Sequence, residues 1–157
     1  MSKEVKYLKS PLGLLKITVK HDKLISIKYV KEKGKQLVKE INSEVMKKTL
    51  IQLEEYFNHK RNNFELPLSI EGTDFQKDVY KALLKVNYGG VISYKKLAVN
   101  SGHPKAYRAV GTALKKNKIP IVIPCHRVIK SDHSLGNYTG GKWRKEELLE
   151  LEESEFI

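Results

Sequence analysis

The sequence predicts two domains: an α/β domain over residues 1–70, with antiparallel strands and one long helix, and a mainly helical domain over residues 71–157. Hydrophobic and polar residues alternate between positions 14 and 29, which is typical of strands with one buried face. From position 35 the hydrophobic spacing changes to three and four residues, which is typical of an amphipathic helix. In the second half, two short helices joined by a glycine-containing turn indicate a helix-turn-helix.

The first domain is predicted to begin with strands, and residues 5–8 (VKYL) are a candidate for the first of three. The next two form an antiparallel hairpin around His21-Asp22, because hydrophobic positions repeat every second residue on both sides of this polar break. We expect one buried face to hold Leu15, Ile17 and Val19 from before the break and Ile25, Ile27 and Tyr29 from after it.

A long helix is predicted after the hairpin. Its hydrophobic positions are Leu37, Ile41, Val45, Met46, Leu50, Leu53 and Phe57. The polar segment 58–63 (NHKRNN) ends it. Residues 64–68 (FELPL) are predicted as a short edge strand, because Pro67 has no N–H to donate in a central strand. Residues 67–72 then connect the two domains.

The second domain opens with a capping box, in which Thr73 and Gln76 have the spacing that caps a helix reciprocally. The helix is expected to stop at residues 87–90 (NYGG), and its hydrophobic stripe is Phe75, Val79, Ala82, Leu83 and Val86. Ser93 is placed to cap a second helix, which ends at Gly102. A third helix is predicted over residues 105–116 (KAYRAVGTALKK).

This third helix, paired with the second, is the predicted helix-turn-helix. Small residues surround Arg108 on it (Ala106, Ala109 and Gly111), so its backbone could approach a nucleic acid closely. The chain carries a net charge of +12. Nine basic residues and no acidic residue lie between Ser93 and Lys130. A segment with basic residues and no acidic ones is typical of a phosphate-binding surface. The alternative is a lysine-rich face that is only solvated.

The single cysteine, Cys125, excludes an intramolecular disulfide and a zinc site of the paired-cysteine type. A free thiol favours a reducing compartment, and the charged N-terminus MSKEVKYLK lacks the apolar core of a signal peptide. No apolar run near the cysteine is long enough to span a bilayer. We therefore expect an intracellular protein, cytoplasmic or associated with the nucleoid, that has no membrane partner.

Cys125 stands between a proline and a histidine, where an apolar run ends. A thiol becomes a nucleophile as the thiolate, which a nearby base or cation favours, and His126 and Arg127 supply both. In an extended chain neighbouring side chains point to opposite sides, so His126 could reach the Cys125 thiol only across a tight turn or through a bridging water. Of these two, we expect the water. A final helix over about residues 144–153 offers Glu152, on the side of Leu148 and Leu149, to orient His126. The alternative is a cysteine that only packs in the core, with His126 on the surface.

The segment 123–129 (IPCHRVI), preceded by 108–120 (RAVGTALKKNKIP) and followed by 135–141 (LGNYTGG), closely resembles the active-site region of the O6-alkylguanine-DNA alkyltransferases. The resemblance runs from about Thr73 to Glu152. It implies a ribonuclease-H-like N-terminal domain, followed by a winged-helix-like DNA-binding domain with the helix-turn-helix. It also implies repair of DNA by direct reversal: the damaged nucleotide is flipped out of the duplex, and its alkyl group moves irreversibly onto the cysteine.

The resemblance implies a role for individual residues. Cys125 matches the alkyl acceptor, His126 the base that activates it through a water, and Glu152 the carboxylate that orients the base. Tyr94 matches the tyrosine that protonates guanine N3 as the base leaves. Arg108 matches the arginine that fills the gap left by the flipped nucleotide.

Further residues match positions that hold the substrate or DNA. Asn117 matches the hinge between the recognition helix and the active-site segment, and the loop lining the base pocket supplies Tyr138, Thr139 and Gly140. The remaining substrate- or DNA-binding positions are Ala106, Arg127 and Val128. The sequence departs from the family at Thr139, where serine is frequent, and at Tyr107, where a small residue is usual. No cofactor and no metal are implied.

The implied partner is double-stranded DNA containing O6-alkylguanine, bound through its minor groove by a monomer. Two other functions fit parts of the sequence. The related alkyltransferase-like proteins bind DNA without catalysis and replace the cysteine, commonly with tryptophan, so the presence of Cys125 argues against this class. A cysteine hydrolase would require turnover and an oxyanion hole, for which the sequence offers no residues. One added alkyl group in the intact mass would distinguish transfer from binding alone.

Overall fold

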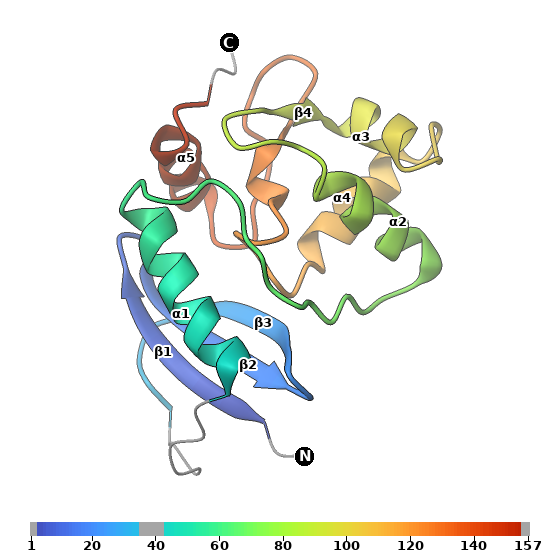
Figure 1. The fold of residues 1–157 in the computed structure, drawn as a ribbon. Coiled ribbons are helices and arrows are strands. Elements are labelled where there is room, and N and C mark those ends of the chain that lie inside the picture. Colours follow the sequence, from blue (N-terminus) through green and yellow to red (C-terminus); the bar gives the residue numbers. More distant parts are fainter. Residues whose placement is uncertain (1–2, 35–42, 155–157) are drawn as a thin grey trace. The chain divides into compact units, whose positions relative to one another are not determined.

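The computed structural model of the chain describes residues 3–34 and 43–154. The chain divides into two compact units, Met1–Ser69 and Ile70–Ile157, each of which is described by itself (Figure 1). In the first unit, the strands β1 (Glu4–Ser10), β2 (Gly13–Lys20) and β3 (Lys23–Val30) form an antiparallel sheet in that order. Helix α1 (Glu44–Phe57) packs against this sheet. The three predicted strands are therefore confirmed.

The hairpin between β2 and β3 turns at His21 and Asp22, whose φ angles of 52° and 57° are left-handed. Two left-handed residues in a two-residue loop are typical of a type I′ turn, whose twist matches the flanking strands. Val19 pairs with Leu24 and Thr18 with Ser26, so the register shifts at this point.

Ile25 is the extra residue of this β-bulge. The bulge corrects the predicted buried face of β3. Leu24 and Ile27 are 0% and 1% exposed, whereas Ile25 is only half-buried. A strict period of two places Ile25 on the wrong face, because the extra residue reverses the alternation.

Helix α1 begins after Ser43, whose hydroxyl oxygen accepts a hydrogen bond of 3.1 Å from the N–H of Met46. The start of the predicted long helix, including Leu37 and Ile41, lies outside the described residues. The predicted edge strand at residues 64–68 is reduced to one parallel bridge between Leu24 and Leu68. There Pro67 contributes its carbonyl, which accepts a hydrogen bond of 2.9 Å from the N–H of Leu24.

The second unit contains α2 (Asp74–Leu83), α3 (Tyr94–Asn100), α4 (Tyr107–Lys115) and α5 (Lys142–Leu151). The predicted capping box is present: Thr73 accepts from the N–H of Gln76 at 3.1 Å, and the Gln76 side chain accepts from the N–H of Thr73 at 3.0 Å. Helix α2 ends at Leu83, earlier than predicted. Ser93 caps α3 as predicted, accepting from the N–H of Lys96 at 3.0 Å.

A short parallel pair of strands, which the sequence did not indicate, positions the site. β4 (Ile92–Ser93) pairs with β5 (Val128–Ile129), with Ile92 opposite Val128 and Ser93 opposite Ile129. The pair therefore joins the start of α3 to the segment immediately after Cys125–Arg127. Helices α3 and α4 pack together and are connected by a turn in which Gly102 has a left-handed φ of 87°. This arrangement is consistent with the predicted helix-turn-helix.

Candidate active site

Cys125 lies on a single 3-10 turn, Cys125–Arg127, within a segment that is buried from residue 119 to residue 129. The N–H of Arg127 donates to the carbonyl of Pro124 at 3.0 Å and closes the turn. The tight turn, one of the two alternatives open from the sequence, is therefore present, and the bridging water stays a prediction. In a 3-10 turn, consecutive side chains are rotated by about 120° instead of pointing to opposite sides. Cys125 itself is 4% exposed.

Burial raises the pKa of the Cys125 thiol to about 11, although a hydrogen bond from the Asn117 side chain and the charge of Lys145 act to lower it. The thiol is therefore protonated at neutral pH in the free protein. Its conversion to a thiolate requires a base that can accept the proton.

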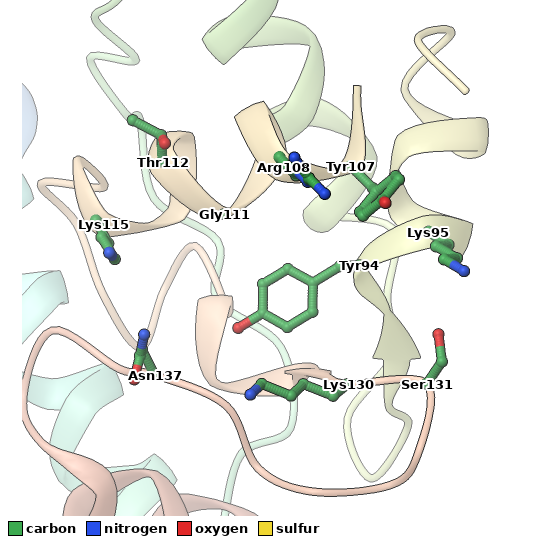
Figure 2. Close-up of a pocket in the computed structure, with 10 residues that line it drawn as sticks. All are labelled: Tyr94, Lys95, Tyr107, Arg108, Gly111, Thr112, Lys115, Lys130, Ser131 and Asn137. Carbon is green, nitrogen blue, oxygen red and sulfur yellow. The ribbon is translucent and has the colours of Figure 1, made fainter. Parts of the chain in front are cut away.

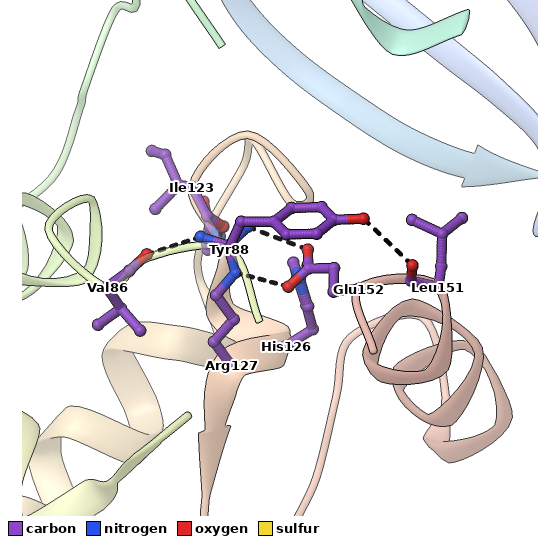
Figure 3. A network of polar contacts seen from close by, with 8 residues as sticks. Val86, Tyr88, Ile123, His126, Arg127, Leu151 and Glu152 are labelled. Atoms are coloured by element: carbon purple, nitrogen blue, oxygen red, sulfur yellow. Dashed lines mark hydrogen bonds and ion pairs between the residues drawn. The ribbon is translucent and has the colours of Figure 1, made fainter. Parts of the chain in front are cut away.

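Three buried side chains next to the cysteine form one polar network, in which Glu152 lies between His126 and Arg127 (Figure 3). His126 Nε2 is 2.7 Å from Glu152 Oε2. Arg127 donates from Nε to Glu152 Oε1 at 2.8 Å and from Nη2 to Oε2 at 3.0 Å. His126 is 0% exposed and Glu152 is 2% exposed. The predicted contact between His126 and Glu152 is thus present, with Glu152 directly after the last residue of α5.

The network fixes the charge of its members. Burial alone would raise the pKa of Glu152, but the hydrogen bonds and charges of His126 and Arg127 outweigh it and lower this pKa to about 2. Burial lowers the pKa of His126, so the imidazole is neutral at pH 7. With Nε2–H donating to the Glu152 carboxylate, Nδ1 is the ring nitrogen that can accept a proton. In the described part of the chain, this Nδ1 is buried and has no hydrogen-bond partner.

The side chain of Arg127, which is predicted to contact substrate or DNA, lies in the buried network with Glu152. It is 6% exposed, and its third nitrogen, Nη1, donates to the carbonyl of Val86 at 2.6 Å. All three guanidinium nitrogens are therefore engaged inside the protein. Val128, also predicted to contact the substrate, is 0% exposed on β5. Both side chains therefore lie inside the protein, and contacts of these two residues with substrate or DNA stay predictions.

Asn117 connects the end of α4 to the segment that carries the cysteine. Its side-chain Nδ2 donates to the carbonyl of Ile123 at 2.9 Å, and its Oδ1 accepts from the N–H of Ile119 at 3.0 Å. The same side chain hydrogen-bonds the Cys125 thiol. Asn117 thus lies at the predicted hinge position and closes the loop between residues 117 and 123.

A basic pocket of about 500 Å³ opens between α3, α4 and the segment after β5 (Figure 2). Four cations and no acidic side chain are among its lining residues, which are Tyr94, Lys95, Tyr107, Arg108, Gly111, Thr112, Lys115, Lys130, Ser131 and Asn137. Tyr94 and Arg108 are the predicted site residues that line it. Lys95 Nζ lies 5.4 Å from the centre of the Tyr107 ring.

The loop at residues 135–141 lines this pocket through Asn137, and not through the predicted Tyr138, Thr139 and Gly140. Thr139 is exposed, Tyr138 is half-buried and Gly140 is buried. Ala106 is half-buried at the start of α4 and is also not among the lining residues. Of the predicted site residues, His126, Arg127 and Glu152 thus form the buried network, and Tyr94 and Arg108 line the basic pocket.

Sequence reasoning missed Lys145, a lysine on α5 that is 0% exposed. Its Nζ donates to the carbonyls of Val128 at 2.5 Å, of Leu135, and of Asn137 at 3.2 Å. The sequence held a signal for it, because Lys145 precedes the buried Leu148 and Leu149 by three and four residues and so shares their side of the helix.

The described residues hold no group of three or more His, Cys, Asp or Glu side chains that could bind a metal ion. Among the helices of residues 3–34 and 43–154, none is both long and apolar enough to cross a membrane.

Comparison with known proteins gives two family matches that together span most of the chain. Residues 5–70 match the ribonuclease-like domain of 6-O-methylguanine DNA methyltransferase, and residues 74–154 match the DNA binding domain of the same family. The methylated-DNA–protein-cysteine methyltransferase of Methanosarcina acetivorans is 40% identical over 148 residues, covering 92% of this chain and 95% of that protein. Its counterpart from Methanosarcina barkeri is 51% identical over 113 residues, covering 72% of each chain.

Solved structures agree with the sequence matches. The crystal structure of Mycobacterium tuberculosis OGT in complex with DNA superposes with a TM-score of 0.85 and 36% identity, covering 95% of this chain and 92% of that one. The fold therefore consists of a ribonuclease-like N-terminal domain and a C-terminal DNA-binding domain. Fold, family models and full-length relatives agree: this chain belongs to the family of the methylated-DNA–protein-cysteine methyltransferases.

Proposed function

We propose that this protein repairs O6-alkylguanine in DNA by transferring the alkyl group to Cys125 in a single turnover. The observation that carries the proposal is the buried Cys125 thiol directly before His126, whose imidazole is held by Glu152, in a chain of this family. A cysteine that only packed in the core would not need a buried imidazole–carboxylate–guanidinium network beside it, because burying such groups is costly.

The reaction requires two proton movements. The Cys125 proton passes through a water to Nδ1 of His126, which is the acceptor atom of the neutral ring. The thiolate then attacks the alkyl carbon, so that a carbon–sulfur bond forms while the carbon–O6 bond breaks and its electron pair stays with guanine. Tyr94 donates its hydroxyl proton to guanine N3 and makes the base a better leaving group. The thioether is stable, so Cys125 is used once.

The basic pocket supports binding of a nucleotide that has left the duplex. Flipping costs a few kcal/mol, and Arg108 occupies the gap in the duplex while Lys95, Lys115 and Lys130 attract phosphates. We propose that the helix-turn-helix of α3 and α4, in a winged-helix-like domain, approaches the minor groove. We also propose a ribonuclease-H-like topology for the first domain, a monomeric protein, and a location in the cytoplasm or at the nucleoid.

The experiment is a titration of duplex DNA carrying one O6-methylguanine with increasing protein, followed by digestion and quantification of the modified nucleoside. The proposal predicts that O6-methylguanine disappears in proportion to the protein added, one per molecule, with guanine appearing in its place. Cys125→Ala should remove none while still binding the duplex. Loss of many O6-methylguanines per protein molecule, or equal loss with Cys125→Ala, would contradict single-turnover transfer to this residue.

A further inference from the structure

Lys145 holds two backbone segments against α5. Its ammonium group donates to the carbonyl of Val128, three residues after Cys125, and to the carbonyls of Leu135 and Asn137 in the loop that follows β5. Its side chain is wholly buried, and within residues 3–34 and 43–154 it forms no ion pair with a carboxylate. Burying an ammonium group is costly unless its hydrogen bonds are satisfied, and here backbone carbonyls satisfy them.

The loop that Lys145 holds runs directly against the Tyr94 hydroxyl. A Cβ atom added at Gly136, where φ is +73°, would lie 2.8 Å from Tyr94 Oη. The backbone of Asn137 also hydrogen-bonds this hydroxyl, which acts to lower a Tyr94 pKa that burial raises. Figure 2 shows the Tyr94 hydroxyl directed toward the side of the pocket on which Asn137 lies. Asn137 therefore accepts a hydrogen bond from Lys145 through its carbonyl, and its backbone hydrogen-bonds the Tyr94 hydroxyl.

We propose that Lys145 is a positioning residue for Tyr94: it fixes the backbone of residues 135–137, and Asn137 in turn orients the Tyr94 hydroxyl in the pocket. The inference rests on the proposed role of Tyr94 as proton donor. A donor contributes only when its proton is aimed at the accepting atom, and a misplacement of about 1 Å can cost about 100-fold in rate. Lys145 lies outside the basic pocket lining, so its removal should slow the transfer step without weakening the binding of DNA.

The test is a double-mutant cycle with Lys145→Met, Tyr94→Phe and the double variant. The single-turnover rate constant is measured at saturating duplex containing O6-methylguanine, and the Kd is measured with unmodified duplex. We expect Lys145→Met to lower the rate constant about 10- to 100-fold, with the Kd changed less than about twofold. Lys142→Met, at an exposed position of the same helix, is the matched control and should leave both values unchanged.

The cycle separates positioning from general support of the fold. If Lys145 acts through Tyr94, then adding Tyr94→Phe to the Lys145→Met variant should lower the single-turnover rate constant less than about twofold. The inference would be overturned if the two substitutions lowered the rate constant independently, so that the fold-losses of the single variants multiplied in the double variant. Should Lys145→Met fail to fold, Lys145→Arg keeps the cation but presents a planar group to the three carbonyls. A rate loss in Lys145→Arg that disappears in the Tyr94→Phe background would then support the inference, and an unchanged rate would overturn it. Absence of transfer in the unaltered protein would instead refute the proposed function.

Discussion

Replacing Glu152 with glutamine should destabilise the protein strongly, because it removes the only carboxylate in the described network around His126 and Arg127. The carboxylate accepts two hydrogen bonds from Arg127 and one from His126 in a site that is 2% exposed. Glutamine would leave the buried guanidinium without a counter-charge. Removing one partner of a buried ion pair costs about 3–5 kcal/mol.

The lowered pKa of Glu152 gives the pH dependence of this contribution to stability. Its folded-state pKa of about 2 lies below the ordinary value of 4.5. Each pKa unit corresponds to about 1.4 kcal/mol, so the ionised carboxylate contributes about 3 kcal/mol of stability at pH 7. Because the folded pKa is the lower one, this stability is fully present above pH 4.5 and is lost as the pH falls toward 2. A loss of about 3 kcal/mol is a large share of a typical stability of about 5–15 kcal/mol.

The assay is urea unfolding followed by circular dichroism, since Trp143, the one tryptophan, is half exposed and a poor probe of the core. Glu147→Gln, at an exposed position of α5, is the matched control and should stay within about 0.5 kcal/mol of the unaltered protein. We expect Glu152→Gln to lose about 3 kcal/mol at pH 7, and the difference to shrink between pH 4.5 and 2. A Glu152→Gln variant as stable as the control at pH 7 would refute the reasoning.

Three further predictions follow from the site. Arg108→Ala should slow repair in duplex DNA more than transfer from free O6-benzylguanine, since only the duplex needs its gap filled; equal losses in both rates would assign Arg108 to the fold. Asn117→Ala should cost about 2–3 kcal/mol in urea unfolding, because it removes two buried hydrogen bonds that close the 117–123 loop; a loss below about 0.5 kcal/mol would contradict this. Because the pKa of Cys125 is raised to about 11, its rate of alkylation by iodoacetamide should keep rising with pH up to about 10, and a plateau below pH 9 would contradict the raised pKa.

Features with a local origin could be predicted from the sequence. The capping box of Thr73 and Gln76 and the cap at Ser93 depend on side chains within three residues of one another. The hairpin depends on a period of two around one polar break. The contact between His126 and Glu152 also followed from the sequence, since a carboxylate on the hydrophobic side of a short helix needs a buried partner.

Features that depend on distant segments could not be predicted in this way. The pairing of β4 with β5 joins two strands of two residues each, too short to show a hydrophobic period. The bulge at Ile25 arises from the pairing of β3 with β2. The hydrophobic pattern of one strand does not contain this information. The buried partners of Arg127 could not be predicted either, because a guanidinium suits a phosphate or a carboxylate. Only the fold brings Glu152 and Val86 to it.

The central claim is that Cys125 accepts the alkyl group, and the most direct test is the mass of the protein after reaction with duplex DNA carrying O6-methylguanine. The intact protein should gain the mass of one methyl group, and peptide mapping should place it on the segment that contains Cys125. Excess DNA should add no second group, and Cys125→Ala should gain none. An unchanged mass with repaired DNA, a methyl group on another residue, or free Cys125 after several turnovers would contradict the claim.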